Sequence, residues 1–257
     1  SFTNSGKFNI AAGVVAIDNS NVGFFSNSGC AALLLCNGVI TGGTFNNSGS
    51  IVENTNANSS ITSNSGFVQN LNGGTFTIGT NTGTLTTATG DIWTGCVSTE
   101  WATSGNWADG SVPTATDDVV IPDVANDPII GASLAAFAKT VWVQSSSSLT
   151  INATGSLTAN GSRAIGFPAT ACFLNEGTVN NSGTLTLGNT SALGEYGLWN
   201  LSVFNNNTGG AIQIDRSTQI GLVNQGSTFS NAAAITIGAV ASVGIYGFWN
   251  NATFSNN

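Results

Sequence analysis

A short phrase recurs along the chain and constrains its fold more than any other feature. In this phrase a Phe or Val is followed by small residues that include Asn and often Gly, and then by alternating apolar residues. It begins at Phe2, Phe45, Val179 and Phe229. Self-similarity of this kind is typical of a solenoid, in which each coil buries its apolar face only against neighbouring coils.

The C-terminal part of the chain shows how long one coil is. One series of residues recurs every 25 positions: Val179, Phe204, Phe229 and Phe254. A second series recurs after 25, 24 and 26 positions: Asn175, Asn200, Asn224 and Asn250. Residues 194–200 also match residues 244–250 at a spacing of 50, with a plainer segment between them. The sequence therefore predicts coils of about 25 residues, with alternate coils nearly alike.

Within a coil the apolar residues alternate with small polar ones, as in residues 183–188 and 234–238. Alternation places successive side chains on opposite faces of a strand, whereas the spacing expected of a helix is not sustained anywhere. The flanking Gly, Asn, Ser and Thr favour turns. We therefore predict an all-β chain folded as a β-solenoid, that is, a parallel β-helix. Its polar corners are expected to stack and hydrogen-bond along the axis as ladders.

The charge of the chain excludes two classes of partner. Charged residues make up 6% of the sequence, the net charge is −8, and Lys and Arg together number four. A nucleic-acid-binding protein needs a basic surface, so we predict no nucleic-acid partner. No apolar run is long enough for a transmembrane helix, so we predict no membrane insertion.

The composition changes between about Asp91 and Pro128. This stretch holds seven of the twelve acidic residues, three of the six Trp and three of the four Pro. We interpret residues 91–130 as an inserted Trp/Asp/Pro-rich module between solenoid coils in residues 1–90 and 131–257. Because the chain begins and ends inside the repeat, further coils are expected in a longer polypeptide or in a neighbouring subunit.

The order of residues in this module carries a resemblance. Trp93, Trp101 and Trp107, followed by residues 112–113 and 117–122, resemble a module of large secreted repeat proteins of Bacteroidota, of the adhesin or surface-filament type exported by the type IX route. The resemblance implies a right-handed coil, an extracellular or cell-surface location, and a role in attachment or scaffolding.

Three groups of residues are candidate sites, each with a simpler alternative. Trp93, Trp101 and Trp107 would form a glycan-binding platform if their rings were exposed, but we favour a small aromatic core that holds an irregular loop. Asp117, Asp118 and Asp123 are the candidates for a calcium site, although their spacing matches no standard calcium loop, and we favour an acidic turn.

The third group repeats with the 50-residue period: Tyr196, Trp199, Tyr246 and Trp249. We favour packing, or a lateral contact between protomers, over a sugar site for this row.

The sequence gives little indication of disulfides, of metal binding by cysteine or of catalysis. The chain has no His and no CxxC motif among Cys30, Cys36, Cys96 and Cys172, so we favour buried free thiols over a disulfide, and either over a metal site. Without His, a His-based triad is excluded. An acid–base pair of Asp117 and Asp118, as in polysaccharide-degrading β-helices, would be the remaining route. We predict that the chain is not an enzyme and has no cofactor.

The favoured hypothesis is a structural component of an extracellular filament or surface rod that self-associates as a homo-oligomer. The alternative is an adhesin stalk whose Trp-rich module binds cell-surface glycans. A polysaccharide-degrading β-helix is the third hypothesis.

Overall fold

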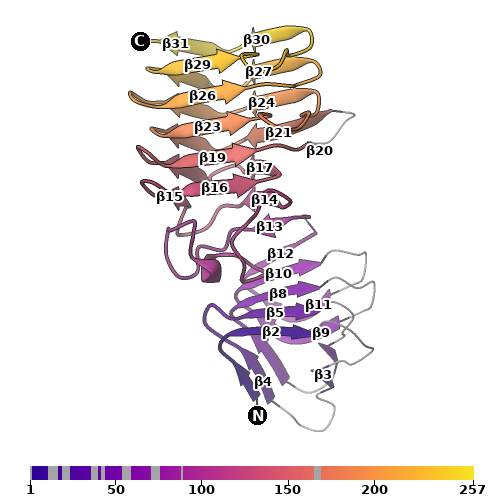
Figure 1. Ribbon diagram of the computed structural model, residues 1–257. Helices are drawn as coiled ribbons and strands as arrows, with labels where there is room; N and C mark the ends of the chain where they lie inside the picture. The colour runs from indigo at the N-terminus through magenta and orange to yellow at the C-terminus, as the bar shows by residue number, and fades with distance from the viewer. Residues whose placement is uncertain are drawn as a thin grey trace. The chain divides into compact units, whose positions relative to one another are not determined.

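A computed structural model describes residues 2–10, 17–18, 24–35, 40–41, 44–53, 59–70, 76–87, 89–164 and 169–257. The chain divides into two compact units. Unit 1 comprises Ser1–Thr89 and Thr103–Ser111, and unit 2 comprises Gly90–Ala102 and Val112–Asn257. The only helical element in the described residues is a single 3-10 turn, Ser104–Asn106. The strands of Figure 1 carry the rest of the regular structure, so the all-β prediction is confirmed.

Unit 1 is a stack of coils with two five-stranded parallel sheets. The first sheet has the order β1 (Phe2–Asn4), β4 (Phe24–Asn27), β7 (Thr44–Asn47), β9 (Ser59–Asn64) and β11 (Phe76–Asn81). The second has the order β12 (Thr84–Thr86), β10 (Phe67–Asn70), β8 (Ser50–Glu53), β5 (Ala32–Leu35) and β2 (Lys7–Ile10). A short third sheet pairs β3 (Ile17–Asp18) with β6 (Ile40–Thr41).

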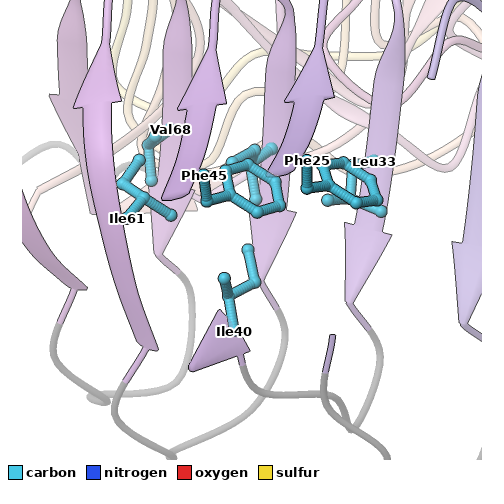
Figure 2. Close-up of a cluster of buried hydrophobic side chains, with 7 residues drawn as sticks. Phe25, Leu33, Ile40, Phe45, Ile61 and Val68 are labelled. Atoms are coloured by element: carbon cyan, nitrogen blue, oxygen red, sulfur yellow. The ribbon is translucent and has the colours of Figure 1, made fainter. Parts of the chain in front are cut away.

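The core of unit 1 lies between these sheets. Phe25 and Phe45, which occupy equivalent positions in successive coils, stack with ring centroids 4.5 Å apart and planes 10° apart. Figure 2 shows them among aliphatic side chains from the facing strands, including Leu33 and Val68, with Ile40 below. Each coil thus buries its inward residues against the coils beside it, as the repeated phrase predicts.

The glycine of the repeated phrase is explained by the closeness of the coils. Gly49, Gly66 and Gly83 follow the inward Asn of three successive coils by two residues. A Cβ atom on Gly66 would collide with the carbonyl oxygen of Gly49, and one on Gly83 with the carbonyl oxygen of Gly66. Any side chain at this corner would therefore hold neighbouring coils apart.

Unit 2 contains three parallel sheets, and each full coil contributes one strand to each of them. The largest sheet has the order β13 (Asp91–Ile92), β14 (Asp118–Ile121), β17 (Thr140–Val143), β21 (Thr170–Asn175), β24 (Tyr196–Asn200), β27 (Ile220–Asn224) and β30 (Tyr246–Asn250), and β20 (Arg163–Ala164) pairs with β21 in antiparallel orientation. The second has the order β15 (Ile129–Ile130), β18 (Ser148–Ile151), β22 (Thr178–Asn181), β25 (Val203–Asn206), β28 (Thr228–Asn231) and β31 (Thr253–Asn256). The third has the order β16 (Ala135–Ala138), β19 (Ser156–Ala159), β23 (Thr184–Leu187), β26 (Ala211–Ile214) and β29 (Ala234–Ile237). Unit 2 is thus a parallel β-solenoid, as predicted.

The Trp/Asp/Pro-rich stretch contributes strands to these sheets. Its strands β13 and β14 form one edge of the largest sheet, and β15 begins the second. Part of the same stretch, residues 103–111, belongs to unit 1. The stretch is therefore built partly of solenoid strands joined by irregular segments.

Asparagines, buried in all but the last member of each series, form hydrogen-bonded ladders that run from coil to coil. In unit 2 the side-chain amide nitrogen of Asn175 donates to the amide oxygen of Asn200 (2.7 Å), Asn200 donates to Asn224 (2.8 Å), and Asn224 to Asn250 (2.7 Å). A parallel ladder joins Asn181, Asn206, Asn231 and Asn256 at 2.7–2.8 Å. A third ladder, in unit 1, joins Asn4, Asn27, Asn47, Asn64 and Asn81 at 2.7–2.9 Å. The predicted ladders are thus present.

The direction of donation is the same at every step of the three ladders: each Nδ2 donates to the Oδ1 of the next coil along the chain. The other hydrogen of the amide is used as well. For example, Asn175 Nδ2 also donates to the carbonyl oxygen of Val203 at 2.8 Å. Because buried amides are costly unless their donors and acceptors are paired, each ladder satisfies polar groups that could not otherwise lie in the interior.

The ladder offsets measure the length of each coil. In unit 2 the partners are 24–26 residues apart, as the sequence predicted. In unit 1 the offsets fall from 23 to 20 and then to 17 residues. The coils of unit 1 are therefore shorter than the C-terminal period indicated.

Candidate functional site

The three tryptophans of the Trp-rich stretch are fully buried. The indole nitrogen of Trp93 donates to the carbonyl oxygen of Asn126 at 2.6 Å, and the side chain of Asn126 donates to the carbonyl oxygen of Gly95 at 2.7 Å. Trp101 lies beside the isolated bridge between Glu100 and Ile129. A sugar stacks on an exposed aromatic face, and Trp93, Trp101 and Trp107 have none. They hold their loops in place and do not form a glycan platform.

The aspartates considered for calcium have local partners. Asp117 accepts hydrogen bonds from the backbone nitrogen and the hydroxyl of Thr114, at 2.8 and 2.7 Å, and so closes a turn. Asp118 pairs with Lys139 at 2.9 Å and accepts a hydrogen bond from the Thr140 hydroxyl. Asp123 lies exposed in the bend after β14. Within the described residues, no three His, Cys, Asp or Glu side chains gather as metal ligands.

Two cysteines differ from the expectation of free thiols. Cys30 and Cys96 are each disulfide-bonded, so the prediction is wrong for both. Cys30 lies exposed in the turn before β5. Cys36 lies outside the described residues. Cys172 is a buried free thiol, as predicted.

The Cys172 thiol is expected to resist alkylation in the folded protein. Burial raises its pKa to about 12, since the thiolate loses its hydration, and the thiol lies 3.8 Å from the carbonyl oxygen of Lys139. Because the thiolate is the reactive form, iodoacetamide at pH 8 should leave Cys172 unmodified until urea unfolds unit 2. Peptide mass spectrometry measures this, and rapid labelling without denaturant would contradict the burial.

One row of side chains crosses the largest sheet on its outer face, and it contains the remaining three tryptophans. Cross-strand pairing aligns these residues in the order Val120, Trp142, Leu174, Trp199, Val223 and Trp249. Tryptophan and an aliphatic residue thus alternate from coil to coil. We call these six residues the aromatic row.

The tryptophans of the row are accessible, whereas the aliphatic residues are covered. Trp142 and Trp199 are half-buried, and Trp249 is 45% exposed. Leu174 and Val223 are only 5% and 2% exposed, although they belong to the same outward row. The spaces between the tryptophans are therefore closed, and the aromatic residues are the accessible part of a nearly continuous strip.

The tyrosines predicted with this row lie beside it. The rings of Tyr196 and Trp199 meet edge to face with centroids 4.9 Å apart. Tyr246, at the equivalent position two coils on, is 58% exposed. The repeat in the sequence identifies these four residues but not Trp142. The Tyr-Gly-Leu-Trp motif is absent around Trp142, and only its pairing with Leu174 places it in the row.

Charged residues surround the Trp142 end of the row. The indole nitrogen of Trp142 donates to Glu176 at 2.7 Å, and the Arg163 guanidinium lies 5.0 Å from the centre of the Trp142 ring. Burial lowers the pKa of Arg163, and the charge of Asp118 opposes this effect. The two cations of this region, Lys139 and Arg163, are therefore held by an ion pair and a cation–π contact.

Polar side chains also lie at the start of β24 and β27, the strands that carry Trp199 and Val223 of the row. Gln219 donates to Glu195 at 2.6 Å, and Glu195 accepts a hydrogen bond from the backbone nitrogen of Thr170 at 3.2 Å. Glu195 and Gln219 are half-buried and directly precede β24 and β27. The site thus combines an aromatic strip with carboxylate and amide groups. It can stack on flat apolar surfaces and exchange hydrogen bonds with hydroxyl groups.

None of the helical structure in the described residues is long and apolar enough to cross a membrane. Neither a search of curated proteins nor a search of solved structures gave a match. A family model described as "Domain of unknown function (DUF8693)" matches residues 92–222, which is 131 of the 257 residues. The matched part includes Trp142 and Trp199 of the aromatic row. Since this model covers more than half of its length, the chain belongs to the DUF8693 family.

Proposed function

We propose that the chain is a structural segment of an extracellular bacterial filament or surface rod, and that copies of it associate with one another. The observation that carries the proposal is the set of interactions parallel to the solenoid axis. In unit 2 these are the backbone hydrogen bonds of three parallel sheets and two asparagine ladders.

A stack of phenylalanines reinforces the same direction. Phe204 and Phe229 are parallel with centroids 4.8 Å apart and planes 1° apart, and Phe254 continues the series at 5.8 Å. An axial load would be shared by all of these contacts at every coil boundary, because each coil repeats them. Such a stack of coils resists extension along its axis, which suits a structural role.

Cysteine chemistry supports the extracellular part of the proposal. Disulfides persist in oxidising compartments and are rare in the cytosol, and Cys30 and Cys96 are both disulfide-bonded. Cys30 is exposed, so a cytosolic reductant would reach it. The small number of charges also suits a repetitive wall of Asn, Ser and Thr better than it suits a site for charged substrates.

We propose no catalytic activity for the chain. It has no His. Of the candidate acid–base pair, Asp117 closes a turn with Thr114 and Asp118 forms an ion pair with Lys139.

Self-association is tested by sedimentation velocity of the purified chain over a hundredfold range of concentration. We expect larger species to grow with concentration and to persist at 0.5 M NaCl, because few of the contacts available to this chain are ionic. A single monomeric species at every concentration would contradict self-association.

A further inference from the structure

The spacing of the tryptophans along the solenoid axis limits which ligands the aromatic row can bind. Adjacent strands of a sheet lie about 4.8 Å apart, so tryptophans on alternate coils are about 9.6 Å apart along the axis. Trp142 and Trp199 are separated by two coils, and so are Trp199 and Trp249. In an extended β-1,4-linked polysaccharide each ring is flipped relative to the last, so the same ring face returns every second sugar, at a closely similar distance.

The filled surface of the row favours a flat partner over a partner whose side chains would insert between the tryptophans. A second solenoid would pack by inserting side chains into hollows between the tryptophans. Leu174 and Val223 occupy those positions and are almost completely covered, so the hollows are closed. A filled aromatic strip matches the apolar CH faces of sugar rings, which stack on indole without penetrating it. The sequence alone favours packing, or a lateral contact between protomers, over a sugar site for this row, and these two observations change that preference.

The charges beside the row favour a neutral chain. Glu176 accepts a hydrogen bond from Trp142, and Glu195 directly precedes β24, the strand that carries Trp199. Both carboxylates would repel a uronic acid or sulfated glycan. Lys139 and Arg163 are already held by Asp118 and Trp142. The carboxylates and Gln219 can instead accept and donate hydrogen bonds to sugar hydroxyls.

We propose that the aromatic row binds an extended, neutral β-1,4-linked polysaccharide that lies parallel to the solenoid axis, with Trp199 and Trp249 stacking on every second sugar. Cellulose and chitin share this geometry and differ at the 2-position. The proposal goes beyond the structural role and does not depend on it, since a rod that does not associate could still carry the row.

The test measures binding of the purified chain to cellulose and chitin particles, and to their soluble hexasaccharides by calorimetry. We expect saturable binding to at least one polymer, and about tenfold weaker binding for Trp199→Ala and for Trp249→Ala, because each loses one stacking contact. Trp199→Tyr should recover part of the affinity. The matched control is Phe137→Ala, which removes a 44% exposed aromatic residue from β16, in a different sheet.

The outcomes separate the proposals. Row-dependent binding to cellulose alone or to chitin alone supports the proposal and identifies the sugar. Binding to neither polymer, or equal binding by the Trp199, Trp249 and Phe137 variants, overturns it. Loss of self-association in Trp199→Ala, without any binding of wild type to glycan, would show that the row contacts protein and would also overturn it. Titration of wild-type tryptophan fluorescence with the hexasaccharides gives a readout that needs no variant.

Discussion

Replacing Asn200 with alanine is expected to lower the free energy of unfolding by about 3 kcal/mol. Asn200 is fully buried, accepts a hydrogen bond from Asn175, and donates to Asn224 and to the carbonyl oxygen of Ser202. The truncation leaves the amide oxygen of Asn224 without its ladder partner and removes one acceptor from Asn175. No water can reach the interior to replace these bonds, so each loss has its full cost. Urea denaturation followed by circular dichroism measures the change.

Asn205→Ala is the matched control for the ladder. Asn205 lies in the next strand of the same coil and hydrogen-bonds Asn180 at 2.9 Å, but it is half-buried on the outward face. Water can replace that bond, so the expected loss is below about 1 kcal/mol. Equal losses for Asn200→Ala and Asn205→Ala would show that the buried ladder contributes no more than an ordinary surface amide.

Phe204→Ala is expected to be the most destabilising of the substitutions considered, at about 4 kcal/mol. The Phe204 side chain is fully buried, stacks on Phe229 at 4.8 Å, and meets Phe173 edge to face at 6.4 Å. Strands on both sides are pinned by backbone hydrogen bonds, so the coil cannot collapse into the cavity. The free energy of unfolding in urea again gives the measurement.

Phe137→Ala provides the comparison, since Phe137 is exposed and its removal leaves no cavity. Its expected cost is below about 1 kcal/mol. A cost for Phe204→Ala as small as that of Phe137→Ala would mean that the axial phenylalanine stack does not hold the coils together.

Much of unit 2 could be predicted from the sequence because two residue types, phenylalanine and asparagine, each recur with the length of one coil. Asn175, Asn200, Asn224 and Asn250 recur at the offsets that the ladder has in the structure. An inward Asn at the end of a strand is recognisable because the same residue type must return once per coil for its amide to be paired.

The features that could not be predicted depend on breaks in this regularity. Val141 pairs with Phe173, so this coil is 32 residues long, and the extra chain includes β20. The longer coil removes Trp142 from the 25-residue register and hides its place in the aromatic row. The disulfide state of Cys30 and Cys96 could not be predicted either, because the chain has no CxxC motif and the positions of its cysteines in the sequence do not show which of them meet.

The burial of Trp93, Trp101 and Trp107 illustrates what sequence alone leaves open. A cluster of tryptophans in a loop-rich stretch is compatible with a binding platform or with a small core, and only the exposure of the rings separates the two. Here the clustered tryptophans are internal, whereas the regularly spaced ones reach the surface.

Electron microscopy of native material, labelled with antibodies against this chain, tests the proposed structural role most directly. The account predicts ordered filaments or rods outside the cell that carry the label at regular intervals along their length. Label confined to dispersed single molecules, with no labelled filament at the cell surface or in the medium, would contradict it.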